Sequence, residues 1–161
     1  MIARQRLRVV VKKEMKMSED ISAFNSVYRF LSNFHYGGRI MLDGARYPTV
    51  EHAYQAAKVD PTRQDLRAEI ASAVAPGRAK RIGQRVPLRS DWEGIKIGIM
   101  LDLLRQKFRP GSLLSKQLLE TGDRKLIEGN TWGDTFWGVC YGVGENHLGR
   151  LLMQVREELR A

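Results

Sequence analysis

The chain contains 161 residues, of which 43% are hydrophobic and 28% charged, as expected of one globular domain with a sizeable core. Its single cysteine, Cys140, excludes an internal disulfide bond, and no apolar run approaches the roughly 20 residues that span a bilayer. We therefore expect a cytoplasmic protein without membrane contact. The net charge of +9 favours an anionic partner, such as a nucleotide, a phosphate or a nucleic acid.

Residues 1–20 differ from the rest of the chain in their charge. Six lysines and arginines crowd this stretch against three acidic residues. The pattern predicts a basic, partly disordered N-terminal extension, followed by one domain over residues 21–161. No apolar region of 7–15 residues follows the basic start, so a secretory signal is not expected. An organelle presequence and a later start at Met15 or Met17 stay open as alternatives.

Short strands and turns are expected over residues 21–47. Asp43-Gly44 is a two-residue hairpin signal between the segments 39–42 and 45–47. These strands and turns are followed directly by a helix that begins at Thr49.

The helix after Thr49 places a carboxylate, an amide and an amine on one stripe. Pro48 interrupts the preceding segment, and Thr49 is a favourable N-cap. Glu51, Gln55 and Lys58 then follow at helical spacing, beside an apolar stripe of valine and alanines. A purely structural interpretation is also open, in which Glu51 stabilises the positive helix N-terminus and Lys58 is a solvated surface charge.

The remainder of the chain is predicted to be mainly helical, which makes the fold class α+β and mostly helical, with a small sheet near the Thr49 helix. Pro76-Gly77 and Pro110-Gly111 are expected to interrupt the chain. The expected elements are helices from Thr62 to about Val74, Trp92 to Phe108 (capped by Asp91), Ser112 to Leu119 and a terminal helix capped by Asn146, with strands at Lys125–Glu128 and Phe136–Tyr141.

Common catalytic and metal-binding signatures are absent from the sequence. It contains no P-loop, no dinucleotide-binding glycine motif, no G-x-S-x-G and no H-E-x-x-H. His35, His52 and His147 lack ligand spacing, so neither a metal nor another cofactor is expected.

The carboxylates near the C-terminal end of the chain lie beside tryptophans. Asp134 lies between Trp132 and Trp137, and Glu128 precedes them. An indole ring stacks on a base, and it raises the proton affinity of a nearby carboxylate by excluding water. Alternatively, both tryptophans are core anchors and Asp134 forms an Asx turn.

Seven motifs, in order, resemble the NADAR superfamily of YbiA-like proteins over roughly residues 22–160. They are Phe30-Leu31-Ser32-Asn33-Phe34, the segment from Tyr47 to Lys58, Ala79-Lys80-Arg81-Ile82-Gly83, Asp91-Trp92-Glu93, Leu104-Arg105-Gln106-Lys107-Phe108, Trp132-Gly133-Asp134 with Trp137-Gly138, and the segment from Gly144 to Met153. The resemblance implies a compact, mostly helical α+β domain that cleaves N-glycosidic bonds. It further implies a phosphorylated ribosyl or ADP-ribosyl substrate: a phosphoribosylamino-pyrimidine of riboflavin synthesis, or ADP-ribose on guanine in nucleic acid.

Such a reaction builds positive charge at C1 of the ribose, which a nearby carboxylate stabilises. We expect Glu51 to be this carboxylate and Asp134 its partner in proton transfer. The remaining predicted roles are orientation of ribose hydroxyls by Asn33 and Asn146, phosphate binding by Lys80, Arg81 and Lys107, and stacking or walling by Trp92, Trp132 and Trp137, with Trp92 the most typical of a core residue.

Lys58 has two alternative roles. A partly desolvated amine beside the ribose can trap the opened sugar as a Schiff base. It can equally pair with Glu51 or with a phosphate.

Two other functional classes stay open. A nucleotide- or nucleic-acid-binding module without turnover agrees with the net charge of +9. In a protein-interaction domain, the carboxylates would be structural, and Glu51→Gln would destabilise the fold.

Overall fold

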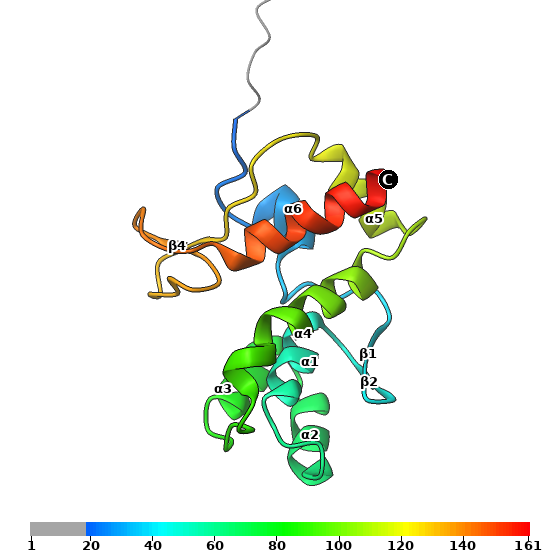
Figure 1. Cartoon of the computed structure of the whole chain (residues 1–161), viewed down its shortest axis with the longest axis vertical. Helices are drawn as coiled ribbons and strands as arrows, with labels where there is room; N and C mark the ends of the chain where they lie inside the picture. Colours follow the sequence, from blue (N-terminus) through cyan, green and yellow to red (C-terminus); the bar gives the residue numbers. More distant parts are fainter. Residues whose placement is uncertain (1–18) are drawn as a thin grey trace, which may run out of the picture.

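Helix α4 (Trp92–Lys107) runs through the middle of the structure, between two groups of helices (Figure 1). The computed structural model describes residues 19–161, so the predicted N-terminal extension lies, apart from its last two residues, outside the described residues. One group holds α1 (Val50–Ala57), α2 (Gln64–Ala71) and α3 (Pro76–Gly83), and the other holds α5 (Leu113–Glu120) and α6 (His147–Arg160). This arrangement confirms the predicted α+β, mostly helical fold.

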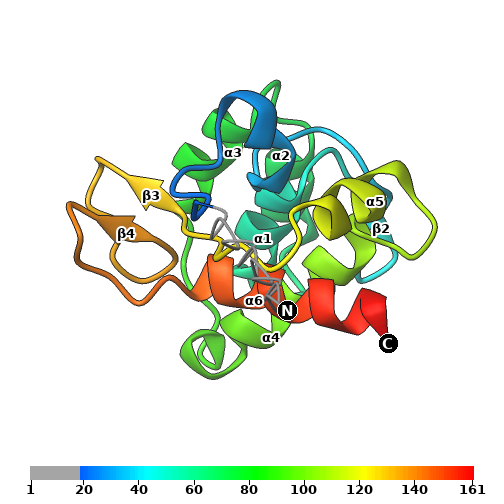
Figure 2. The ribbon, with the colours of Figure 1, turned by 90° about the horizontal axis from the view of Figure 1, so that it is seen from above.

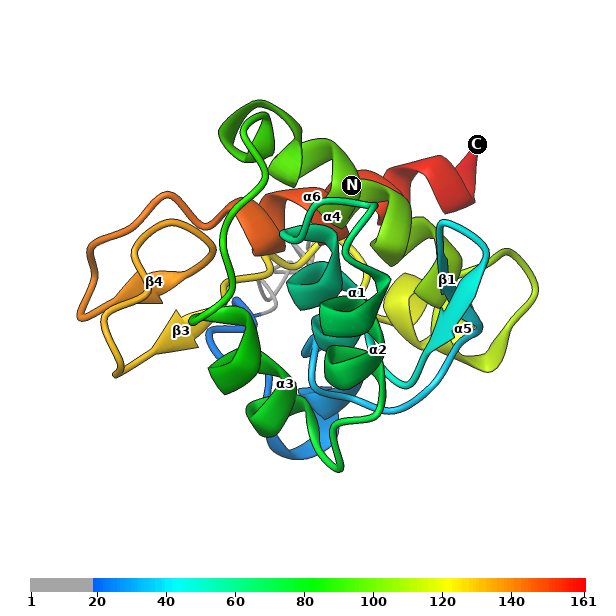
Figure 3. The same cartoon turned by 90° about the horizontal axis from the view of Figure 1, so that it is seen from below.

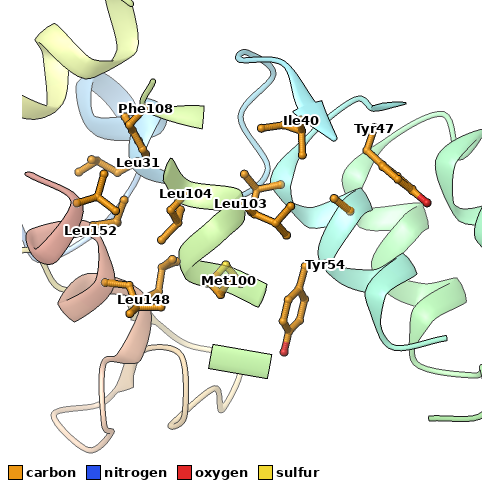
Figure 4. Packing of buried hydrophobic residues seen from close by; sticks show 14 of the residues in the cluster. Leu31, Ile40, Tyr47, Tyr54, Met100, Leu103, Leu104, Phe108, Leu148 and Leu152 are labelled. Atoms are coloured by element: carbon orange, nitrogen blue, oxygen red, sulfur yellow. The ribbon is translucent and has the colours of Figure 1, made fainter. Parts of the chain in front are cut away.

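The hydrophobic core joins both groups of helices through α4. Met100, Leu103 and Leu104 of α4 lie between Leu148 of α6 and Tyr54 of α1 (Figure 4). All five side chains are buried. Because α4 contributes to both halves of one core, the two groups are packed as a single unit.

Two small sheets complete the fold. Strands β1 (Ile40–Leu42) and β2 (Ala45–Tyr47) pair antiparallel around Asp43-Gly44, which confirms the predicted hairpin. Strands β3 (Gly129–Asn130) and β4 (Val139–Cys140) pair parallel and are shorter than the predicted strands. Leu126, inside the predicted strand Lys125–Glu128, forms only an isolated bridge to Ile21.

Helix α1 is buried along its whole length, and its start is fixed by hydrogen bonds. The side chain of Thr49 accepts from the backbone N–H of His52 at 3.2 Å, which confirms the predicted cap. The imidazole of His52 lies 2.8 Å from the Thr49 hydroxyl through Nδ1 and 3.0 Å from the Ala73 carbonyl through Nε2. These contacts tie the first turn of α1 to the segment between α2 and α3.

Several local predictions are wrong. Asp91 precedes α4 as expected, but its carboxylate accepts from Arg89 and makes no capping hydrogen bond. Residues 26–31 form a 3₁₀ helix, η1 (Ser26–Leu31), rather than a strand. The Thr62 hydroxyl donates to Asp60 instead of capping α2, which begins two residues later at Gln64. Pro76 is the first residue of α3 rather than an interruption, because the first turn of a helix needs no N–H donor there.

No helix within residues 19–161 is both long enough and apolar enough to cross a bilayer.

Candidate functional site

A pocket of about 400 Å³ opens beside α1. The elements around it, including α1, α3 and the β3–β4 region, lie on the side of the molecule away from α5 (Figures 2 and 3). The lining combines three carboxylates, two lysines, four aromatic rings and a few smaller groups: Glu51, Glu128, Asp134, Lys58, Lys80, Phe34, Tyr54, Trp132, Trp137, Ser32, Asn33, Gln55, Met100 and Leu148.

Glu51 is the most enclosed carboxylate of the pocket. Its side chain lies in the first turn of α1, where the residue is only 6% exposed. Gln55, one turn later, donates from Nε2 to Glu51 Oε1 at 2.7 Å. Burial raises the pKa of Glu51, while the hydrogen bond from Gln55 and the charges of Lys80 and Lys58 act in the opposite direction. Glu51 therefore has a raised proton affinity and close cationic neighbours.

The amide of Gln55 is positioned by close packing against α3. Gly83 lies against this amide, and a Cβ atom at Gly83 would overlap Gln55 Oε1. Gln55 Oε1 is buried without a hydrogen-bond partner among the described residues, and so is Asn33 Oδ1. Both residues line the pocket, but Gln55 Oε1 is turned toward Gly83.

Glu128 and Asp134 form the opposite acidic part of the pocket. Glu128 Oε2 is buried and has no partner in the described part of the chain. Burial, with a further contribution from the charge of Asp134, raises the pKa of Glu128 to about 7. Asp134 Oδ1 accepts from the backbone N–H groups of Phe136 and Trp137 at 3.2 and 2.9 Å. Asp134 therefore forms the Asx-type turn considered above and also lines the pocket.

The two lysines lie against aromatic rings. Burial lowers the pKa of Lys58, although the charge of Glu51 opposes this shift. Lys58 Nζ lies 5.4 Å from the ring centroid of Tyr54. Lys80 Nζ lies 5.8 Å from the ring centroid of Trp132 and 6.0 Å from that of Phe34. Both amines therefore lie in partly apolar surroundings near the carboxylates.

The aromatic wall has a fixed part and an exposed part. Trp137 donates from Nε1 to the Tyr54 hydroxyl at 3.1 Å, and the two rings meet edge to face. Burial raises the pKa of Tyr54, so its hydroxyl stays protonated. Trp132, by contrast, is 63% exposed at the edge of the pocket.

Seven of the eleven predicted site residues line the pocket, and four lie elsewhere. The seven are Asn33, Glu51, Lys58, Lys80, Trp132, Asp134 and Trp137. Trp92 is a core residue, 4% exposed, that packs against Tyr54. Arg81 lines a separate groove, which is described below.

Lys107 and Asn146 support the pocket from behind. Lys107 is buried, which lowers the pKa of its amine to about 7, and it donates to the Ser32 carbonyl at 2.7 Å. Asn146 stands at the N-cap position of α6, but its side chain makes no capping hydrogen bond. Instead it donates to the Leu126 carbonyl and accepts from the Glu128 N–H at 3.0 Å. Neither side chain lines the pocket, because both are held by backbone groups.

Sequence patterns did not select Glu128 or Tyr54 as site residues. Gln55 was placed beside Glu51 by helical spacing but given no role in the site. The backbone of Glu128 donates to Asn146 and accepts from the Val139 N–H at 2.8 Å, and these contacts between distant residues have no local signal. Within residues 19–161, no three His, Cys, Asp or Glu side chains are grouped closely enough to hold a metal ion.

The fold and the pocket define a small α+β domain in which one buried carboxylate, two partly buried carboxylates and two partly buried lysines share one cavity. A family model, the NADAR domain, matches residues 17–160, and the chain belongs to this family.

Relatives of known name cover most of the chain. N-glycosidase YbiA of Escherichia coli (strain K12) is 41% identical over 123 residues, which span 74% of this chain and 75% of that protein. An N-glycosidase of Nostoc punctiforme is 39% identical over 137 residues, 83% of this chain and 86% of the relative. A riboflavin biosynthesis protein of Vibrio vulnificus is 40% identical over 134 residues, but the match spans only 35% of its length.

The fold has also been observed by experiment in a relative. The NMR structure of YbiA from Escherichia coli matches 89% of this chain and 87% of its own, with a TM-score of 0.76 and 38% sequence identity.

The raised pKa of Glu51 has a consequence for stability. A carboxyl whose pKa is raised by folding favours the folded state below its unfolded pKa, and this contribution is lost as the pH rises through the folded pKa. We therefore expect Glu51→Gln to raise the melting temperature relative to the unsubstituted protein, with a difference that grows from pH 5 to pH 8. Differential scanning fluorimetry across this range measures the effect.

The control for this experiment is Glu120→Gln, at the exposed end of α5. Its difference from the unsubstituted protein should not change with pH. A Glu51→Gln protein that melts lower at pH 8 would instead support the structural interpretation of Glu51.

Proposed function

We propose that the protein is an N-glycosidase, which hydrolyses the bond between C1 of a ribose and the nitrogen of a base on a phosphorylated substrate. The observation that carries this proposal is that one pocket holds two enclosed carboxyl groups, Glu51, which is 6% exposed, and Glu128, whose Oε2 is buried without a partner in the described part of the chain. The names of the YbiA and Nostoc relatives support the same reaction class.

Glu51 stabilises the transition state. As the C1–N bond breaks, positive charge develops at C1 and the ring oxygen, and a carboxylate in a poorly solvated site interacts strongly with that charge. Gln55 holds one carboxylate oxygen in place, and Lys58 and Lys80 favour the ionised form.

Glu128 is the general acid in this proposal, although we expected Asp134 to be the partner of Glu51. A carboxyl with a pKa of about 7 is protonated in a large fraction of molecules near neutral pH, so it can donate to the leaving nitrogen. Asp134 contributes its charge, which raises the pKa of Glu128, while one of its own oxygens holds a turn.

The other pocket residues suit a nucleotide. Asn33 lines the pocket and its Oδ1 is an acceptor that lacks a donor, which a ribose hydroxyl supplies. Lys80 binds a phosphate, and Trp132 offers an exposed ring on which a base stacks. Both a phosphoribosylamino-pyrimidine and an ADP-ribosyl guanine carry these groups. The name of the Vibrio relative favours the first, and the positive charge of the chain favours the second.

Lys58 provides a covalent route through the same pocket. Its amine attacks C1, and the base leaves with a proton. The C1–O bond of the ring then opens, with the oxygen becoming a hydroxyl, to give an imine between C1 and Lys58. Water hydrolyses this imine, which releases the sugar and restores the amine. Burial lowers the pKa of Lys58, which favours the neutral amine that this route requires.

The first experiment offers both substrates to the protein and to Glu51→Gln, with release of the base measured by mass spectrometry. We expect release from at least one substrate, and a loss of about 10²- to 10⁴-fold in the variant, since the group it removes acts in the transition state. An equal melting curve or a higher one shows that the variant is folded. Tight, salt-sensitive binding without release from either substrate would favour a binding module over an enzyme.

The assignment of Glu128 predicts the pH profile. The rate should rise with pH as Glu51 ionises, and fall again as the pH passes about 7 and Glu128 loses its proton. In Glu128→Gln, kcat should fall about 10²-fold and the decline above pH 7 should disappear. If Asp134→Asn removes that decline instead, Asp134 is the acid.

Borohydride tests the covalent route. Reduction during turnover should leave a sugar adduct on Lys58, detected by peptide mass spectrometry. Lys58→Arg keeps the charge but cannot form an imine, so it should carry no adduct. Productive turnover without an adduct on the unsubstituted protein would contradict the route.

A further inference from the structure

A second groove, of about 430 Å³, lies along α3 and the start of α2. Four arginines line it, Arg63 from the start of α2 and Arg78, Arg81 and Arg85 from α3 and the residues after it, and Glu69 of α2 is its one acidic residue. Partly buried aliphatic side chains, Leu66 and Ile82 among them, form its floor. The groove therefore carries an excess of positive charge over an apolar floor.

Three of these arginines have no acidic partner in the described part of the chain. Arg63 is paired with Asp65 at 2.7 Å, but no carboxylate lies within 4.0 Å of the Arg78, Arg81 or Arg85 guanidinium. Arg78 and Arg81 lie one turn apart on α3, with Arg85 two residues after its end, and like charges one turn apart on a helix repel each other. The stability of the fold therefore does not explain why these three arginines lie together. A phosphate, by contrast, binds a guanidinium through two charge-assisted hydrogen bonds.

The groove begins beside the mouth of the pocket. Neighbouring residues of α3 line the two cavities, Lys80 the pocket and Arg81 the groove. Arg81 Nη1 and Phe34 Cε2, a pocket atom, each lie 3.9 Å from the position that a Cβ atom would take at Gly77. Figures 2 and 3 show α3 between α2 and the β3–β4 region. A chain-like ligand can therefore pass from the pocket over α3 into the groove.

We infer that this groove binds the phosphodiester backbone of a nucleic-acid strand that carries the nucleotide held in the pocket. The inference rests on the proposed function for the choice of nucleotide, but the groove itself requires only phosphates. Arg78, Arg81 and Arg85 are spread along the groove, so each can bind a different phosphate of one strand. A single phosphate would engage only part of this set.

The test measures binding without turnover. A fluorescent single-stranded 20-mer is titrated with the full-length Glu51→Gln protein between 50 and 200 mM salt, and anisotropy reports the affinity. We compare it with a groove variant that adds Arg78→Gln, Arg81→Gln and Arg85→Gln. The matched control adds Arg39→Gln, Arg109→Gln and Lys116→Gln, exposed residues next to β1 and α5, across the molecule from α3.

The groove variant should bind the 20-mer at least tenfold more weakly at 100 mM salt. Its slope of log affinity against log salt should be smaller by about 2, because each phosphate contact to a single strand contributes about 0.7. The control should stay within threefold of the parent protein. Equal weakening in the two triple variants would overturn the inference, since charge alone would then explain binding.

A second ligand separates a strand from a small phosphate. Calorimetry with ADP-ribose should give similar affinities for the parent and groove variants, and an equal loss for ADP-ribose and the 20-mer would overturn the assignment to a strand. If the melting temperature of the groove variant falls, Arg81→Gln alone should still weaken 20-mer binding about threefold, and an unchanged affinity would count against the groove. Because binding is measured in a variant without turnover, these results hold whether or not the protein proves to be an N-glycosidase.

Discussion

The burial of helix α1 is the constraint on which the rest of the structure depends. Every residue of this helix is buried, including the polar ones, and a buried polar group without a partner destabilises the fold. Thr49 and His52 satisfy each other and the Ala73 carbonyl, while Gln55 satisfies one oxygen of Glu51. The negative charge of Glu51 is balanced by Lys58 and Lys80, which line the same pocket. The pocket therefore lies where a charged residue interrupts the apolar core.

Residues outside the pocket determine its shape through the backbone. Asn146 connects the start of α6 to the backbone of Leu126 and Glu128, and so places the second carboxyl of the site. Lys107 holds the Ser32 carbonyl at the end of η1, next to Asn33. Both residues were predicted to bind substrate. Their buried positions explain why polar side chains are retained there without contact to the pocket.

Local signals were sufficient for some elements and not for others. The Thr49 cap and the Asp43-Gly44 hairpin were predicted from contacts that lie within a few residues, although the equally local caps expected at Thr62 and Asp91 do not form. Strand β4 lies inside the predicted strand Phe136–Tyr141, but its parallel pairing with β3 was not predicted, since it depends on chain segments nine or more residues apart and on packing. The same division applies to the site. The stripe from Glu51 to Lys58 follows from one helix, whereas Glu128 reaches the pocket only through tertiary contacts.

The two sides of the pocket differ in how strongly a substitution disturbs the fold. Glu51 and Gln55 belong to the core, so a change there disturbs packing against Gly83 and the neighbouring helices. Trp132 stands on an exposed loop, where a substitution alters few buried contacts. During divergence from a common ancestor, the bond that is cleaved is therefore expected to persist, while the identity of the leaving base changes by drift in this loop.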